Sequence, residues 1–108
     1  MIAFKPALVV MGVLAAVGSA RAQTTGSAEE GQSLARSLCA QCHLVDKRAG
    51  RSPNAAAPTF ARIANTPGMT STALTAALRT SHRTMPNVIV KDSDLNDLVA
   101  YILGLKDH

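Results

Sequence analysis

Residues 38–44 read LCAQCHL, and this stretch holds both cysteines of the 108-residue chain, with a histidine directly after the second. On one turn of helix, Cys39 lies three residues from Cys42 and four from His43, so the three side chains would share one face. Two thiols and an imidazole on one face can form a redox-active dithiol, part of a metal site or a covalent attachment point for a cofactor.

The surrounding sequence favours one of these three chemistries. A thioredoxin-like dithiol belongs to a βαβ context, and residues 23–108 show no sustained strand alternation. A structural zinc site needs four ligands; His82 or His108 could supply one, but paired zinc-ligand spacing is missing. The third interpretation is C-x-x-C-H as the attachment motif of haem c. Two thiols could add to the two vinyl groups of one porphyrin edge, and the adjacent imidazole could bind the iron.

The first 22 residues have the pattern of a secretory signal peptide. Lys5 precedes an uncharged apolar run from Ala7 to Val17, and Ala20-Arg21-Ala22 gives a small-x-small cleavage pattern. The run is shorter than the roughly 20 residues that a bilayer span needs, so a membrane anchor is not expected. We expect cleavage after Ala22, a domain over residues 23–108 and a periplasmic location, where haem c is attached.

The composition of the exported domain also points to a cofactor. Its aromatic residues are Phe60 and Tyr101, and the chain has no Trp, so its own core is thin. A domain of this size usually needs disulfides, a metal or a cofactor for stability. Loss of the two basic residues of the leader lowers the formal net charge from +4 to +2, which does not suggest nucleic-acid binding.

Periodicity and capping signals predict helices around this motif. Ser27 and Glu30 have capping-box spacing, and an apolar face runs from there to Cys39: Ala28, Gly31, Leu34, Ala35 and Leu38. A short helix is expected from about Thr59, and another from Thr70 or Ser71 with Leu74, Ala77 and Leu78 on one face. The last helix is expected to be capped by Asp92 and to bury Leu95, Leu98, Val99, Ile102 and Leu103. The basic residues of loop 44–58 are expected to face solvent: Lys47, Arg48 and Arg51.

A second iron ligand should come from the segment after the third helix. Met85 precedes Pro86, which stiffens an extended backbone, and it is well placed to reach the far face of a haem. Met69 follows Pro67-Gly68 and is expected to have a core or loop role. His82 is the alternative sixth ligand, and an open sixth site is the remaining possibility.

Several segments together resemble the small class I cytochromes c of bacteria over essentially the whole exported chain. EEGQSLARSLCAQCH looks like the N-terminal helix of that family, with Gly31 eight residues before the first cysteine. APTFARIA is similar to the segment whose proline carbonyl, here that of Pro58, accepts the Nδ1–H of the haem-binding histidine. HRTMPN matches the methionine loop, with Met85 and Pro86 in the expected places. LNDLVAYILGLK is like the C-terminal helix, with Tyr101 as its aromatic residue.

The resemblance implies an all-α cytochrome c fold of three to four helices around one covalently bound haem. The N- and C-terminal helices would cross near Gly31. Cys39 and Cys42 would hold haem c by thioether bonds, and His43 and Met85 would bind its iron. Ala35 replaces an aromatic residue that many relatives carry, and the chain lacks the Trp that many relatives place near a haem propionate. Candidate propionate contacts are Arg51, Asn54 and Thr59.

The implied function is one-electron transfer rather than enzymatic catalysis. Partners would be redox proteins that donate and accept electrons, such as a dehydrogenase, an oxidase or a bc1-type complex. The alternatives are an electron-transfer subunit of a periplasmic dehydrogenase and a peroxidase-like or gas-binding protein with an open sixth site. Two basic clusters either steer an acidic partner or are solvated loop charge: Lys47, Arg48 and Arg51, and Arg79 with Arg83.

Overall fold

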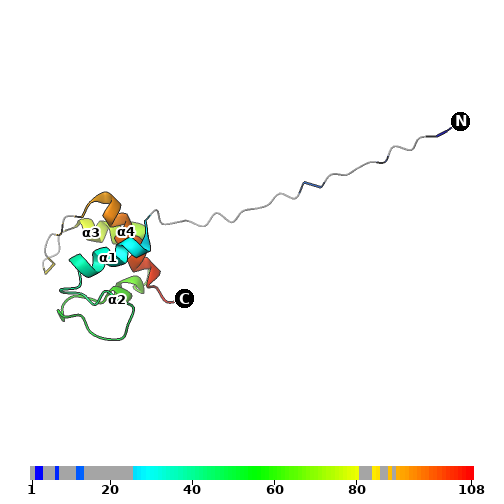
Figure 1. Ribbon diagram of the computed structural model, residues 1–108. Helices are drawn as coiled ribbons and strands as arrows, with labels where there is room; N and C mark the ends of the chain where they lie inside the picture. The colour runs from blue at the N-terminus through cyan, green and yellow to red at the C-terminus, as the bar shows by residue number, and fades with distance from the viewer. Residues whose placement is uncertain are drawn as a thin grey trace.

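A computed structural model gives the architecture (Figure 1). It describes residues 26–80, 84, 85, 88 and 90–108, together with Ile2, Ala3, Ala7, Gly12 and Val13. Within these residues there are four helices and no β-strand: α1 (Ala28–Leu38), α2 (Phe60–Ala64), α3 (Ser71–Arg79) and α4 (Asp92–Gly104). The predicted all-α fold is confirmed. Most of the expected signal peptide, including the cleavage position after Ala22, lies outside the described residues.

The start of α1 is capped from two sides. The Ser27 side chain accepts a hydrogen bond from the backbone N–H of Glu30, at 3.3 Å, as the capping-box spacing predicts. The backbone N–H of Ser27 donates to Asp97 Oδ1 of α4 at 2.8 Å. In a capping box, the Glu30 side chain would accept the hydrogen bond from the N–H of Ser27. Here the Asp97 carboxylate of α4 accepts it instead.

The first and last helices cross at glycine. A Cβ atom on Gly31 would overlap the backbone carbonyl of Asp97 and would lie 2.7 Å from Cβ of Tyr101. A Cβ on Gly26 would likewise overlap the backbone of Asn96. Only glycine allows this approach, and Figure 1 shows α1 lying against α4. The crossing predicted near Gly31 is therefore present.

Helix α4 forms the centre of the core. It buries Leu95, Leu98, Val99, Ala100, Tyr101 and Ile102, while Leu103 is half-buried. The predicted cap is wrong by one residue, because Lys91 occupies the N-cap and makes no side-chain capping bond. Asp92 is the first helical residue, where its negative charge complements the helix dipole without capping.

The two short helices begin at threonine caps. Thr59 Oγ1 accepts from the N–H of Arg62 at 3.2 Å, and Thr70 Oγ1 accepts from the N–H of Ala73 at 3.1 Å. Both helices pack against α4, with Phe60, Ala64 and Leu74 in the core. Gly68, at φ 77°, makes the left-handed turn between them.

The predicted apolar face of α1 is wrong at its two ends. Ala28 is exposed and Leu38 is 45% exposed, whereas Gly31 and Ala35 are buried. The buried face of α1 is therefore shorter than the periodicity predicts. No helix in the described part of the chain is long and apolar enough to cross a membrane.

Candidate cofactor site

The cysteine-histidine segment forms a tight turn directly after α1. Cys39 is the C-cap of the helix, and its carbonyl accepts from the N–H of Cys42 at 3.2 Å and from the N–H of His43 at 2.9 Å. These i→i+3 and i→i+4 bonds continue the helical path beyond Leu38. The predicted common face of the three side chains results from this turn, although α1 itself has ended.

Two hydrogen bonds hold this turn against the following loop. The carbonyl of Cys42 accepts from the N–H of Asn54 at 3.1 Å, and the N–H of Leu44 donates to Ser52 Oγ at 3.0 Å. The carbonyl of Leu44 accepts from the N–H of Phe60 at 2.9 Å. The second half of the loop over residues 44–58 is therefore tied to the turn over residues 39–43, here called the ligand turn, and to Leu44 directly after it.

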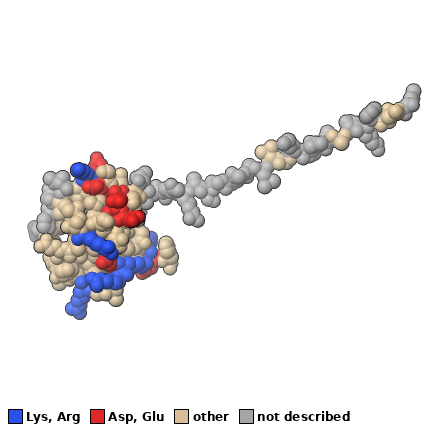
Figure 2. Space-filling model, viewed as in Figure 1, with Lys and Arg blue, Asp and Glu red and all other residues tan. Residues whose placement is uncertain are grey.

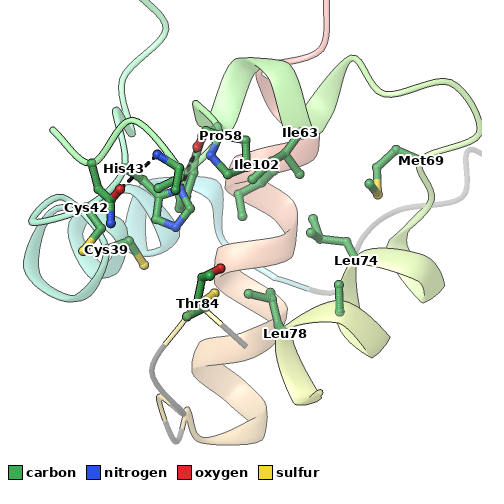
Figure 3. Close-up of a pocket in the computed structure, with 16 residues that line it drawn as sticks. Cys39, Cys42, His43, Pro58, Ile63, Met69, Leu74, Leu78, Thr84 and Ile102 are labelled. Carbon is green, nitrogen blue, oxygen red and sulfur yellow. Dashed lines mark hydrogen bonds between the residues drawn. The ribbon is translucent and has the colours of Figure 1, made fainter. Parts of the chain in front are cut away.

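The imidazole of His43 has a fixed orientation. Its Nδ1 lies 2.6 Å from the carbonyl oxygen of Pro58 (Figure 3). Because a carbonyl only accepts hydrogen bonds, Nδ1 must carry the proton, which leaves Nε2 of the neutral ring with a free lone pair. The buried Phe60 ring packs against the imidazole with its centroid 5.4 Å away and its plane tilted by 53°. This is the tautomer and the restraint that a metal-binding histidine requires.

A cavity of about 440 Å³ opens in front of this group. Cys39, Cys42 and His43 line one end, and Figure 3 shows Met69, Leu74 and Leu78 across from them. Its wall comes from four parts of the chain: Asn54, Ala56, Ala57, Pro58, Phe60 and Ile63; Met69, Leu74, Ala77 and Leu78; Thr84 and Met85; and Ile102. No Asp, Glu, Lys or Arg of the described residues lines it. The volume lies within the range of small-molecule sites, roughly 300–1,000 Å³.

The two thiols are free and partly exposed to this cavity. Burial raises the pKa of the Cys39 thiol above its ordinary value, because desolvation disfavours the thiolate. Among the described residues, no three His, Cys, Asp or Glu side chains come together as a metal-binding group.

Most predicted site residues meet at the cavity, and two do not. Asn54 lines it, whereas Arg51 and Thr59 line an adjoining groove that shares Ala56, Ala57 and Pro58 with the cavity. The alternative ligand His82, as well as Arg83 and Pro86, lies outside the described residues. Arg51 and Thr59 therefore lie beside the cavity rather than in its wall, and their contact with a propionate stays a prediction.

Sequence reasoning missed part of the wall. Thr84 has no signal of its own, but it lines the cavity (Figure 3). Met69 was expected in the core or a loop, and it is half-buried and lines the cavity. The i, i+3, i+4 spacing of Leu74, Ala77 and Leu78 predicts a shared face, and all three line the cavity.

Two of the four described cations in the predicted clusters are paired. Lys47 Nζ lies 3.3 Å from Asp107 Oδ1, and Arg79 Nη2 lies 2.7 Å from Asp92 Oδ1. Figure 2 shows basic side chains mainly along the lower part of the displayed face and acidic ones mainly along its upper part. Lys47, Arg48 and Arg51 are all exposed, as predicted.

The residues fit a covalently attached haem. Two free thiols and an imidazole with its Nε2 lone pair stand at one end of an apolar cavity, and a thioether lines the same cavity. Thiols, imidazole and thioether are the donors that c-type haem uses. An all-α fold with crossing terminal helices around such a site defines a small c-type cytochrome.

Comparisons with known proteins agree with this class. Residues 26–102 match the family model described as cytochrome c oxidase, cbb3-type, subunit III, and the chain belongs to this family of c-type cytochromes. The chain is also similar to cytochrome c-552 of Bradyrhizobium diazoefficiens, at 32% identity over 94 residues, which cover 87% of this chain and 89% of that protein. No solved structure matches the chain significantly.

Family membership decides between the three chemistries of the cysteine-histidine motif. The chain carries covalently bound haem c and acts in electron transfer, as proteins of this family do, and it is not an enzyme. The dithiol, zinc and peroxidase-like interpretations are therefore set aside.

Proposed function

We propose that this cytochrome is an exported one-electron carrier with a single haem c bound by Cys39, Cys42, His43 and Met85. The observation that carries the proposal is the one cavity that all four side chains line. When bound, haem c supplies an iron that takes up and releases one electron. The protein's part is to hold, orient and enclose it.

Cys39 and Cys42 are the tethers in this proposal. The two cysteines lie on one turn, which is fixed by the hydrogen bond from the N–H of Cys42 to the carbonyl of Cys39. This placement suits two adjacent attachment points on one edge of the cofactor. His43 presents Nε2 to the metal because Pro58 accepts the Nδ1 proton. A hydrogen bond to a carbonyl also raises the basicity of the ligating nitrogen.

Met85 is the second axial ligand in this proposal. Its thioether is a soft donor, which favours the ferrous state and raises the reduction potential relative to a second histidine. The cavity wall acts in the same direction, since none of its described side chains is an Asp, Glu, Lys or Arg, and an apolar environment disfavours added positive charge. Retention of both ligands in both oxidation states would keep structural change on electron transfer small.

The leader pattern and the family support a location and a class of partners. The signal-peptide pattern over residues 1–22 supports export to the periplasm. The matching family is named for a subunit of an oxidase, which supports a place in a respiratory chain. We therefore propose redox proteins as donor and acceptor, namely a dehydrogenase, an oxidase or a bc1-type complex. Permanent membership of a dehydrogenase complex is the second candidate.

Fractionation of cells that produce the full chain tests this proposal. We expect a haem-stained protein in the periplasmic fraction, with an N-terminus at Gln23 and elution apart from any larger enzyme. Co-elution with a larger enzyme through repeated chromatography would favour the bound subunit. Retention in the cytoplasm without haem would contradict the proposal.

A further inference from the structure

An arginine-aspartate pair joins the two ends of the segment that carries Met85. Arg79 is the last residue of α3, Asp92 is the first residue of α4, and Nη2 of the arginine lies 2.7 Å from Oδ1 of the aspartate. Thr84 and Met85, from the connection between these helices, line the cavity. The pair therefore links the end of α3 to the start of α4, and the connection between these two points carries the proposed second axial ligand.

Each member of the pair suits the helix end on which it lies. A cation is stabilised at a helix C-terminus and an anion at a helix N-terminus. The packing of α3 against α4 brings these ends together, with Leu74 buried in the same core as Leu98. The sequence gives no signal for the pair, because the two residues meet only when the helices pack.

We propose that Arg79 and Asp92 are positioning residues for Met85. By holding the ends of α3 and α4 together, the pair restrains the connection and disfavours displacement of the thioether from the iron. The inference rests on the proposed function, in which Met85 is the axial ligand. This inference gives Arg79 a structural role inside the protein, whereas its charge alone suggested that it steers an acidic partner.

The expected effect is small, because the side chains of Arg79 and Asp92 are 59% and 88% exposed. Exposed pairs of this kind contribute little and are weakened by salt. Loss of the pair should therefore raise the apparent affinity for a competing ligand about two- to fivefold.

Imidazole binding to the ferric holoprotein measures this restraint, since imidazole competes with Met85 for the iron. We expect Arg79→Gln to bind imidazole about two- to fivefold more tightly than the native protein at low salt. Asp92→Asn should act similarly, and the double variant should add little to either single change, since all three lack the same pair. High salt should raise the affinity of the native protein and leave that of Arg79→Gln nearly unchanged.

Lys47→Gln is the matched control, because it removes one positive charge and one exposed ion pair, to Asp107, and neither residue lines the cavity. It should bind imidazole as the native protein does. Equal affinities for the native protein and Arg79→Gln, or an equal increase in Lys47→Gln, would overturn the inference.

A further variant separates this inference from the ligand assignment. In Met85→Ala, the far-red sulfur-to-iron charge-transfer band of the ferric protein should disappear. If the band survives, the axial assignment is wrong. If it disappears while Arg79→Gln leaves imidazole binding unchanged, the assignment stands and the positioning role is wrong.

Discussion

At the scale of single residues, two methionines share the cavity and only one is assigned to the iron. Met85→Ala should abolish the far-red sulfur-to-iron band and open a position for carbon monoxide on the reduced protein. Met69→Leu is the matched control, because it also changes a thioether in the cavity wall. An absorption spectrum of each variant decides the assignment. Loss of the band in Met69→Leu, with retention in Met85→Ala, would reverse it.

Tyr101 joins the last helix to the start of the loop over residues 44–58 by one buried hydrogen bond. Its hydroxyl donates to the carbonyl of Val45 at 2.7 Å. Tyr101→Phe leaves that carbonyl without its partner and should lower the free energy of unfolding by about 1–2 kcal/mol. Urea unfolding at neutral pH measures the loss. An unchanged midpoint would show that the hydrogen bond contributes nothing net.

The same hydroxyl predicts a stability change at alkaline pH. Burial raises the pKa of Tyr101 above its ordinary value, so folding favours the neutral phenol. This contribution is complete below the unfolded pKa of about 10 and is lost as pH rises through the higher folded value. Urea unfolding across this range should show a fall in stability that is smaller in Tyr101→Phe. Parallel profiles for both proteins would contradict this account.

At the scale of helices, the crossing of α1 and α4 depends on Gly31. Gly31→Ala would drive a Cβ into the backbone carbonyl of Asp97, and rigid backbone cannot yield cheaply. We expect a loss of about 1–3 kcal/mol from overpacking, despite a helix-propensity gain of about 1 kcal/mol. Gly104→Ala in α4 is the control, because a Cβ there meets nothing within 4 Å. Thermal unfolding should show a lower midpoint for Gly31→Ala and an equal or higher one for Gly104→Ala.

The helices themselves could be predicted because their signals are local. Thr59 and Thr70 indicate helix starts because a threonine side chain can cap a helix. The helical spacing of Leu95, Leu98 and Val99 indicates α4. The errors occur where tertiary contacts decide. Lys91 caps α4 through backbone geometry alone, and Leu38 is exposed because the chain turns toward the cofactor site there.

The candidate site could be predicted for similar reasons. Cys39, Cys42 and His43 are close in sequence and form a recognisable motif, and Met85 was found through its proline neighbour and the family resemblance. Contacts that form only on packing left no pattern, which is why the cavity position of Thr84 and the Arg79–Asp92 pair were not foreseen.

At the scale of the whole molecule, the cavity shows why the domain needs its cofactor. Without the cofactor, the mostly apolar lining of this open cavity of about 440 Å³ stays in contact with water, so the domain loses much of the apolar burial that stabilises a small fold. The total stability of a small domain is about 5–15 kcal/mol. The haem-free Cys39→Ala/Cys42→Ala variant should therefore show no cooperative thermal transition by circular dichroism. A native-like transition without haem would mean that the polypeptide core suffices.

Covalent attachment of one haem by Cys39 and Cys42 is the basis of the proposed function. Mass spectrometry of the exported protein under denaturing conditions measures this attachment. We expect a mass excess of one haem that survives denaturation and is absent from the Cys39→Ala/Cys42→Ala variant. A chain without added mass and with two free thiols would contradict it.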